Sequence, residues 1–221
     1  GKDTEKLKEI YGKMRDFLKT KKPNEIDLPE IRDVKAFIRK SEAYAGARYA
    51  GLQDKNIHFM ALPFYETGKS EKNPAKEIDV DLTVELLQKI KPHQVFAAGD
   101  FDDPHGTHIV CFRIILEAMK RLRETEEWTK DCWLWMYRGA WDEFETHEIE
   151  MAVPLSPIEV QRKRNAIFQH QSQKDQPVFP GDDHREFWMR AQERNRETAR
   201  NYDKLGLANY EAMEAFVRWK F

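Results

Sequence analysis

The sequence predicts an α/β fold, with a mainly parallel sheet, crossover helices and a helix-rich C-terminal third. Short apolar runs at 57–62 and 94–99 alternate with amphipathic segments, an order typical of strand–helix–strand units. Helical periodicity dominates after residue 156, and no repeat or linker divides the chain. We therefore expect a single domain over 1–221, made of an α/β part at 1–155 and a helical extension at 156–221.

The N-terminal half is predicted to contain three helices and two strands. Apolar residues at helical spacing indicate helices at 4–20, 29–50 and 80–90. The inner face of the second helix is expected to carry Ile31, Val34, Phe37, Ile38 and Tyr44. Gly51 follows as a residue that can end it. The run at 57–62, which stops at Pro63, predicts a buried strand, and 94–99 predicts another.

The C-terminal half begins with a predicted helix and continues with strands. The expected ranges are a helix at 104–123, strands at 131–137 and 149–153, and helices from 157, at about 184–205 and at 210–219. Ser156 and Glu159 have the spacing of a capping box, with Pro157 at the first helical position. Asp183 and Glu186 repeat that spacing for the long helix, and Gly206 follows as its stop.

Composition and charge exclude several classes of function. The 221 residues carry a formal net charge of −2, which argues against nucleic-acid binding as the main role. No apolar run is long enough for a membrane span, so we expect no membrane partner. The two cysteines form no metal or redox pair, so we expect a reduced cytoplasmic setting. Because the chain opens at Gly1 without a methionine, we interpret it, as a hypothesis, as a fragment of a longer protein.

The stretch from Ala97 to His108 is the most informative part of the sequence. A predicted strand runs into a polar turn, where α/β proteins place ligands, and Asp103 and Pro104 suit the start of a helix. His105 and His108 are three apart and are expected on one helical face. A helix N-terminus keeps both imidazoles neutral, the form that binds metal or accepts a proton. Two histidines at this spacing are more often ordinary packed or exposed residues, and a catalytic zinc takes three protein ligands.

These residues resemble the second motif of the PIG-L/LmbE-like de-N-acetylases. The resemblance rests on Gly99-Asp100 and on Asp103-Pro104-His105-Gly106-Thr107-His108. Further stretches, at 91–94, 135–141, 170–174 and 210–216, resemble the C-terminal half of long bacterial proteins named as glucosamine-6-phosphate deaminases. In those proteins a deaminase domain precedes a de-N-acetylase-like domain. The resemblance covers essentially the whole chain.

The resemblance implies a fold and a set of site residues. The fold would be an LmbE-like, Rossmann-type three-layer sandwich that is truncated at its N-terminus. His108 matches the zinc ligand, and His105 matches the histidine that stabilises the oxyanion and helps to protonate the leaving amine. Arg39, at the start of an RxxE motif, would contact substrate, and Glu66 would belong to an acidic sugar-binding loop. The ordinary alternatives are an ion pair for Arg39 and a solvated loop for Glu66.

The chain also departs from the pattern of this family. The first motif of the family, His-Pro-Asp-Asp, supplies the other two zinc ligands and the catalytic aspartate, and the sequence does not contain it. We expect this motif upstream of Gly1, so that zinc is held by the intact domain and is absent from this chain or weakly bound by it. In addition, Thr107 stands where the family often has aspartate.

The implied function is zinc-dependent hydrolysis of the N-acetyl amide of an amino sugar, or of its phosphate, in amino-sugar catabolism. The isolated chain is expected to be inactive and to need the upstream part of the same polypeptide. A truncated sheet exposes a strand edge that can pair with another chain, so a homo-oligomer is one possible arrangement. The alternative is a non-catalytic interaction or oligomerisation appendage of the deaminase. Its interface would lie on the helical third, with Phe187, Trp188, Phe216 and Trp219.

Overall fold

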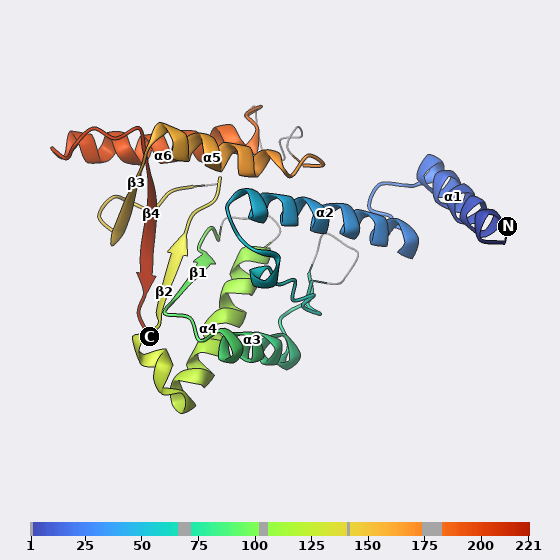
Figure 1. Ribbon diagram of the computed structural model, residues 1–221, viewed down its shortest axis with the longest axis horizontal. Coiled ribbons are helices and arrows are strands. Elements are labelled where there is room, and N and C mark those ends of the chain that lie inside the picture. The colour runs from blue at the N-terminus through green and yellow to red at the C-terminus, as the bar shows by residue number, and fades with distance from the viewer. Residues whose placement is uncertain (1, 66–71, 102–105, 141, 174–182) are drawn as a thin grey trace.

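A four-stranded mixed sheet forms the centre of the molecule (Figure 1). The computed structural model describes residues 2–65, 72–101, 106–140, 142–173 and 183–221. The strands are β1 (Gln94–Ala98), β2 (Trp133–Tyr137), β3 (Met151–Leu155) and β4 (Ala212–Trp219), in the order β1-β2-β4-β3. β1 and β2 are parallel, whereas β4 runs antiparallel to both β2 and β3. The α/β class is confirmed, but the expectation of a mainly parallel sheet is wrong.

The difference comes from the C-terminal segment. Residues 210–219, predicted as a short helix, form β4 and lie between two partner strands. Alanine, methionine and glutamate favour helices locally, yet hydrogen bonding to β2 on one side and β3 on the other outweighs this preference. The helix-rich C-terminal third therefore contributes a central strand to the sheet.

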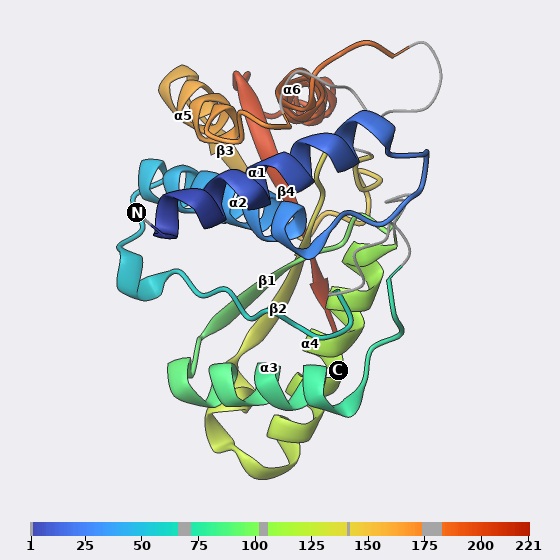
Figure 2. The same cartoon turned by 90° about the vertical axis from the view of Figure 1, so that its right-hand side faces the viewer.

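Helices cover both faces of the sheet (Figures 1 and 2). On one face, Ala97 and Leu134 pack against Phe112 of α4 (Thr107–Thr125), and α3 (Glu77–Ile90) packs on α4. Successive strand residues point to opposite faces, so Tyr137 and Phe216 point to the other one. Both line a cavity there, together with residues of α5 (Pro157–Phe168) and α6 (Phe187–Lys204).

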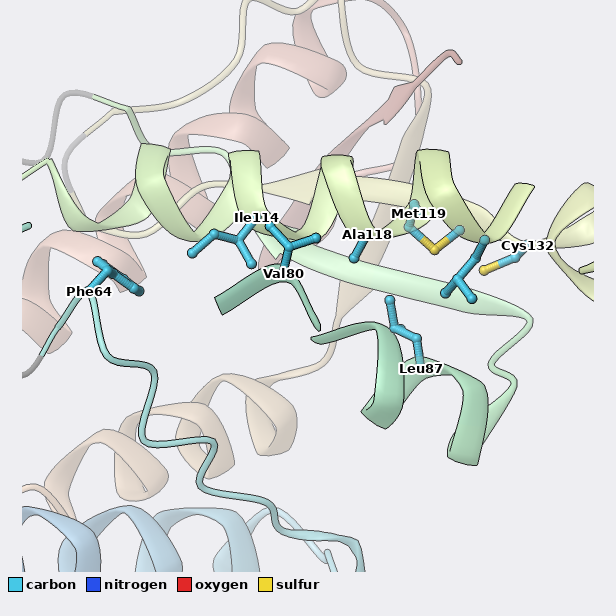
Figure 3. Packing of buried hydrophobic residues seen from close by; sticks show 8 residues of the cluster. Phe64, Val80, Leu87, Ile114, Ala118, Met119 and Cys132 are labelled. Atoms are coloured by element: carbon cyan, nitrogen blue, oxygen red, sulfur yellow. The ribbon is translucent and has the colours of Figure 1, made fainter. Parts of the chain in front are cut away.

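The main apolar core lies between α3 and α4 (Figure 3). Val80 and Leu87 of α3 meet Ile114, Ala118 and Met119 of α4, all of them buried. These positions follow the three-and-four spacing of an amphipathic helix, which explains why both helices were predictable. No helix in the described part of the chain combines the length and apolar character needed to cross a membrane.

The first two helices lie at the edge of the molecule. They are α1 (Lys2–Thr20) and α2 (Pro29–Tyr49), and α1 projects away from the sheet (Figure 1). The predicted inner face of α2 is largely wrong, because Val34, Phe37 and Ile38 are exposed, Phe37 to 72%. Ile31 is buried as expected, and Gly51 adopts a left-handed conformation just after the end of α2.

The predicted strand at 57–62 is also wrong. This segment follows a short 3-10 helix, η1 (Asp54–Asn56), and pairs with no strand among the described residues. It packs against α2 instead: the ring of Phe59 lies 4.9 Å from that of Tyr44, and the Lys40 ammonium lies 5.0 Å from the Phe59 ring. A short apolar run fits either a strand or an apolar contact with a helix, and periodicity does not distinguish the two.

The ends of the later helices test the capping predictions. Ser156 and Glu159 form the predicted capping box, in which the Ser156 amide donates to the Glu159 carboxylate at 2.7 Å. Helix α6 begins at Phe187 and not near 184, because Asp183 accepts hydrogen bonds from Arg185 and does not cap the helix. Gly206, with positive φ, follows the end of α6 as predicted. A second 3-10 helix, η2 (Glu127–Asp131), links α4 to β2.

Candidate functional site

The candidate catalytic centre lies where β1 ends and α4 begins. His108 is in the first turn of α4, and its Nδ1 lies 3.0 Å from the backbone carbonyl oxygen of Asp100. A carbonyl oxygen only accepts hydrogen bonds, so Nδ1 carries the proton and donates it. In the neutral ring the lone pair is then on Nε2. This is the tautomer of a histidine that ligates metal through Nε2 while a backbone carbonyl orients the ring.

The carboxylate of Asp100 ties this turn to the end of β2. Asp100 is fully buried, at 0% exposure, and its Oδ2 accepts a hydrogen bond of 3.2 Å from the Gly139 amide. The Arg138 guanidinium lies 3.8 Å from Oδ1 and compensates the charge. A Cβ at position 139 would lie 3.1 Å from Oδ2, so a side chain there would require the carboxylate to shift by a few tenths of an ångström. We call His108, Asp100, Arg138 and Gly139 the strand-end site.

The other predicted site residues are distributed differently. His105 and Glu66 lie outside the described residues. Helix α4 begins at Thr107, directly after the left-handed Gly106. Arg39 is exposed on α2 and, within the described part of the chain, forms no hydrogen bond. Glu42 accepts two hydrogen bonds of 2.7 Å from Ser172 and so links α2 to the segment after α5.

The strand-end site offers one fitting zinc ligand, His108. Among the described residues, no three histidine, cysteine, aspartate or glutamate side chains gather as a metal cluster. The Asp100 carboxylate is already occupied by Gly139 and Arg138. Further ligands would have to come from outside the described ranges.

A cavity of about 540 Å³ opens beside the strand-end site and shares Arg138 and Gly139 with it. Its lining comes from the end of β2, from β4, and from α5, α6 and the segment after α5. The lining residues are Tyr137, Arg138, Gly139, Ala140, Lys163, Ile167, His170, Gln173, Phe187, Ala191, Arg194, Glu214 and Phe216. Its volume is typical of small-molecule sites. We call it the α5–α6 cavity.

A buried ion network forms one wall of this cavity. The Arg194 guanidinium, 7% exposed, donates to Glu143 at 2.5 Å and to Glu214 at 2.6 Å. The Lys163 ammonium donates to Glu214 and, at 2.8 Å, to Asn195. Burial alone would raise the pKa of Glu214, but Lys163 and Arg194 together outweigh burial and hold that pKa below its ordinary value.

Two further groups in the wall of the cavity have shifted pKa values. Burial lowers the pKa of Lys163, and Glu214 only partly opposes this effect. Burial raises the pKa of Tyr137, with Cys111 and Glu214 adding to the shift. Perturbed groups that border a cavity are typical of binding and catalytic sites, although structural ion networks also produce them.

Sequence reasoning missed this cavity. Its carboxylate, Glu214, lies between Met213 and Ala215, which are buried, and was placed in a predicted helix. Read as a strand, 212–219 would have placed Glu214 on the face opposite to Met213 and Ala215. The misassigned strand therefore also concealed the site.

Comparison with known proteins found one curated relative and two solved structures that resemble the fold. No known protein-family profile matches the chain. Over 214 residues the chain is 51% identical to a Bacteroides thetaiotaomicron protein named as glucosamine-6-phosphate deaminase-like. The match covers 96% of the chain but 32% of that protein, so the chain spans about a third of the length of this relative.

Two solved structures resemble the fold. A conserved protein of Thermus thermophilus is 17% identical, with a TM-score of 0.52 and coverage of 91% of this chain and 76% of its own. The 4-carboxy-2-hydroxymuconate hydratase GalB of Pseudomonas putida is 16% identical, with a TM-score of 0.54 and coverage of 84% and 72%. At these identities the likeness shows the fold alone.

Proposed function

We propose that the chain is the C-terminal, de-N-acetylase-like part of a longer protein of amino-sugar catabolism. The whole protein would hydrolyse the N-acetyl amide of an amino sugar or of its phosphate. The observation that carries this proposal is the contact between His108 Nδ1 and the Asp100 carbonyl, because with Nδ1 as donor Nε2 is the ring nitrogen that would ligate a metal. The motif at 99–108 and the deaminase-like name of the 51% identical relative support it.

Each described residue has a distinct part in this mechanism. His108 would hold zinc through Nε2, while Asp100 fixes the ring through its carbonyl and the turn through its carboxylate. Zinc, when bound, supplies Lewis-acid polarisation of the amide carbonyl and lowers the pKa of water. His105 would stabilise the oxyanion and give a proton to the leaving amine. The remaining ligands and the general base would come from an upstream His-Pro-Asp-Asp motif.

Two further parts of the proposal concern the substrate contacts and the cellular compartment. Arg39 and Glu66 are proposed substrate contacts on the strength of the family resemblance. The two cysteines, Cys111 and Cys132, are free thiols, in keeping with a reducing, cytoplasmic setting. Alone, the chain would hold zinc weakly and be inactive, since it brings one fitting ligand among its described residues.

Acetate release tests the proposal directly. The full-length protein is incubated with N-acetylglucosamine 6-phosphate and zinc, and compared with His108→Ala and with His147→Ala. His147 is an exposed histidine in a turn, which makes it a matched control. We expect at least a hundredfold loss of acetate release in His108→Ala and none in His147→Ala. Equal rates in all three proteins, or no release by the wild type, would reject the proposal.

A second candidate is a non-catalytic interaction module of the deaminase. The residues first expected to form its interface (Phe187, Trp188, Phe216 and Trp219) are all at least partly buried. The observation that favours this candidate is instead on α1 and α2, where Tyr11 and Phe37 are 68% and 72% exposed. The rest of the longer protein would cover these apolar side chains. Tyr11→Ser with Phe37→Ser would then weaken its association with residues 1–221 without changing acetate release.

A further inference from the structure

We infer that a strand from the rest of the longer polypeptide pairs with the outer side of β1 and extends the sheet. The inference rests on the part of the proposed function that makes the chain one section of a longer protein, and not on the hydrolysis. The surface involved is the backbone on the outer side of β1 together with the exposed rings of Phe96 and Trp133. We call it the open β1 edge.

One side of the β1 backbone bonds to β2. The His93 carbonyl accepts a hydrogen bond of 3.0 Å from the Trp133 amide, and the Gly99 amide donates one of 2.8 Å to the Tyr137 carbonyl. Successive residues of a strand direct their backbone groups to alternate sides. Every second residue from His93 to Gly99 therefore bonds to β2, and the residues between them face the other way.

The opposite side of the backbone is open. The amides and carbonyls of Gln94, Phe96 and Ala98 point away from β2, and no hydrogen bond occupies them in the described part of the chain. Such a row of unpaired groups is a template for a further strand. A segment placed here would be held by the same kind of ladder that joins β1 to β2.

The two edges of the sheet differ in their protection. Natural edge strands often carry charged residues or proline, which prevent further pairing. β3, at one edge, contains Pro154, which has no amide hydrogen to offer. β1, at the other edge, has the sequence Gln-Val-Phe-Ala-Ala, with neither a charge nor a proline. This composition favours a strand that has neighbours on both sides in the whole protein.

Aromatic side chains beside this edge are also uncovered. Ala97 and Leu134 face α4, so their neighbours Phe96 and Trp133 lie on the opposite face of the sheet, where they are 46% and 42% exposed. The Arg218 guanidinium lies 4.1 Å from the centre of the Trp133 ring. Exposed apolar surface of this kind marks interaction sites. A segment that pairs with β1 would extend the sheet beside these rings, so one partner would cover both the backbone groups and the aromatic surface.

The rest of the polypeptide is the partner that this surface favours. The match with the Bacteroides relative covers 32% of that protein, so about two-thirds of it lies outside the match. A five-residue edge with two aromatic rings is small beside the roughly 1,200–2,000 Å² that stable associations bury. A second copy would therefore bind weakly through it. A segment of the same polypeptide needs less contact, because tethering gives it an effective concentration in about the millimolar range.

Photo-cross-linking of the purified full-length protein identifies the partner. Phe96→p-benzoylphenylalanine places the reactive group at the open β1 edge. Val153→p-benzoylphenylalanine, at a position that is 40% exposed on the other edge strand, is the matched control. Mass spectrometry locates the linked peptides, and a denaturing gel separates links within one chain from links between two copies.

The expected links are specific to position 96. We expect it to link to peptides of the same chain that lie outside residues 1–221, and position 153 to give none of these links. Links from position 96 only to residues 1–221, links only to a second copy, or no links at all would overturn the inference.

Hydrogen exchange in the full-length protein tests the pairing itself. The amides of Val95 and Ala97 face β2 and provide the internal reference for a formed ladder. We expect the amides of Phe96 and Ala98 to exchange within tenfold of that reference, whereas an open edge would exchange them at least a hundredfold faster. Fast exchange at Phe96 and Ala98 beside protected Val95 and Ala97 would overturn the inference.

A charge at the edge should release the added strand. Phe96→Glu should speed exchange of the Ala98 amide at least tenfold, whereas Val153→Glu, at similar exposure, should not. Protection of Val95 and Ala97 in each variant shows that β1 is still paired with β2 and that the protein is folded. Unchanged protection of Ala98 in folded Phe96→Glu would overturn the inference.

The result is separable from the hydrolysis. A paired β1 edge in a protein that releases no acetate would leave this inference intact and reject the deacetylase. Acetate release by a protein with an open β1 edge would do the reverse.

Discussion

The strand-end site and the α5–α6 cavity lie side by side but differ in completeness. The strand-end site fixes one histidine tautomer and one buried carboxylate, yet offers only one fitting metal ligand among the described residues. The cavity has three cations, a carboxylate and aromatic walls, all from described residues. The cavity is therefore formed by residues of this chain alone, whereas in the proposed function the strand-end site would need groups from beyond the described residues.

The largest expected effect is on the network of the cavity. Arg194→Met leaves Glu143 and Glu214 with one cation fewer, and removing one partner of a buried pair typically costs about 3–5 kcal/mol in the free energy of unfolding. Urea titration measures the loss. The matched control is Arg200→Met on the same helix, where an exposed pair with Glu193 contributes at most about 1 kcal/mol. Similar losses in the two variants would mean that the network is not a distinct structural unit.

A smaller effect is expected at the strand-end site. Asp100→Asn keeps an acceptor for the Gly139 amide but removes the charge that compensates Arg138. A buried hydrogen bond that involves a charged group contributes about 1.5–3 kcal/mol, so we expect a loss of about 2 kcal/mol in urea. Asp81→Asn, at an exposed pair with Arg121, serves as control. A neutral effect at Asp100 would show that the turn does not depend on this charge.

Acid should weaken the cavity through Glu214. The pKa of this carboxyl in the folded state is held below its ordinary value of 4.5, so the folded state binds the proton less tightly than the unfolded state. The resulting stabilisation is full above the ordinary pKa and is lost as the pH falls through the lowered one. Glu214→Gln should therefore flatten the dependence of the free energy of unfolding on pH below 4.5. An unchanged acid limb would contradict this assignment.

The smallest effects are expected on α2. Arg39→Ala should leave the free energy of unfolding unchanged, because the side chain is exposed. If Arg39 contacts substrate, the same change raises KM for the amino sugar and leaves kcat alone. Glu42→Ala should cost about 1 kcal/mol, since it loses the hydrogen bonds from Ser172. An unchanged KM in Arg39→Ala would remove this residue from the substrate site.

The sequence predicted the elements whose signal is local. The helices α3 and α4 follow apolar periodicity, and the capping box at Ser156 follows from two side chains three residues apart. The α/β class and the turn that carries Asp100 and His108 were predicted for the same reason. His108 accordingly lies in the first turn of α4, just after the end of β1, and its role as a metal ligand stays a prediction.

Elements that depend on distant partners were missed. Residues 212–219 become a strand only because β2 and β3 lie on either side, and 57–62 does not become one because it packs on α2 instead. The α5–α6 cavity depends on that central strand, so its ion network could not be predicted once 210–219 was assigned to a helix. Local pattern was thus sufficient to place His108 after β1, but it predicted neither the contacts of Asp100 with Gly139 and Arg138 nor the cavity beside them.

The zinc content of the full-length protein tests the central claim most directly. The protein is purified at neutral pH without chelator, and metal is measured by mass spectrometry in the wild type, in His108→Ala and in His147→Ala. The account predicts about one zinc per chain in the wild type and in His147→Ala, and a loss of most of it in His108→Ala. Equal zinc in all three proteins, or none in the wild type, would contradict the assignment of His108 as a metal ligand.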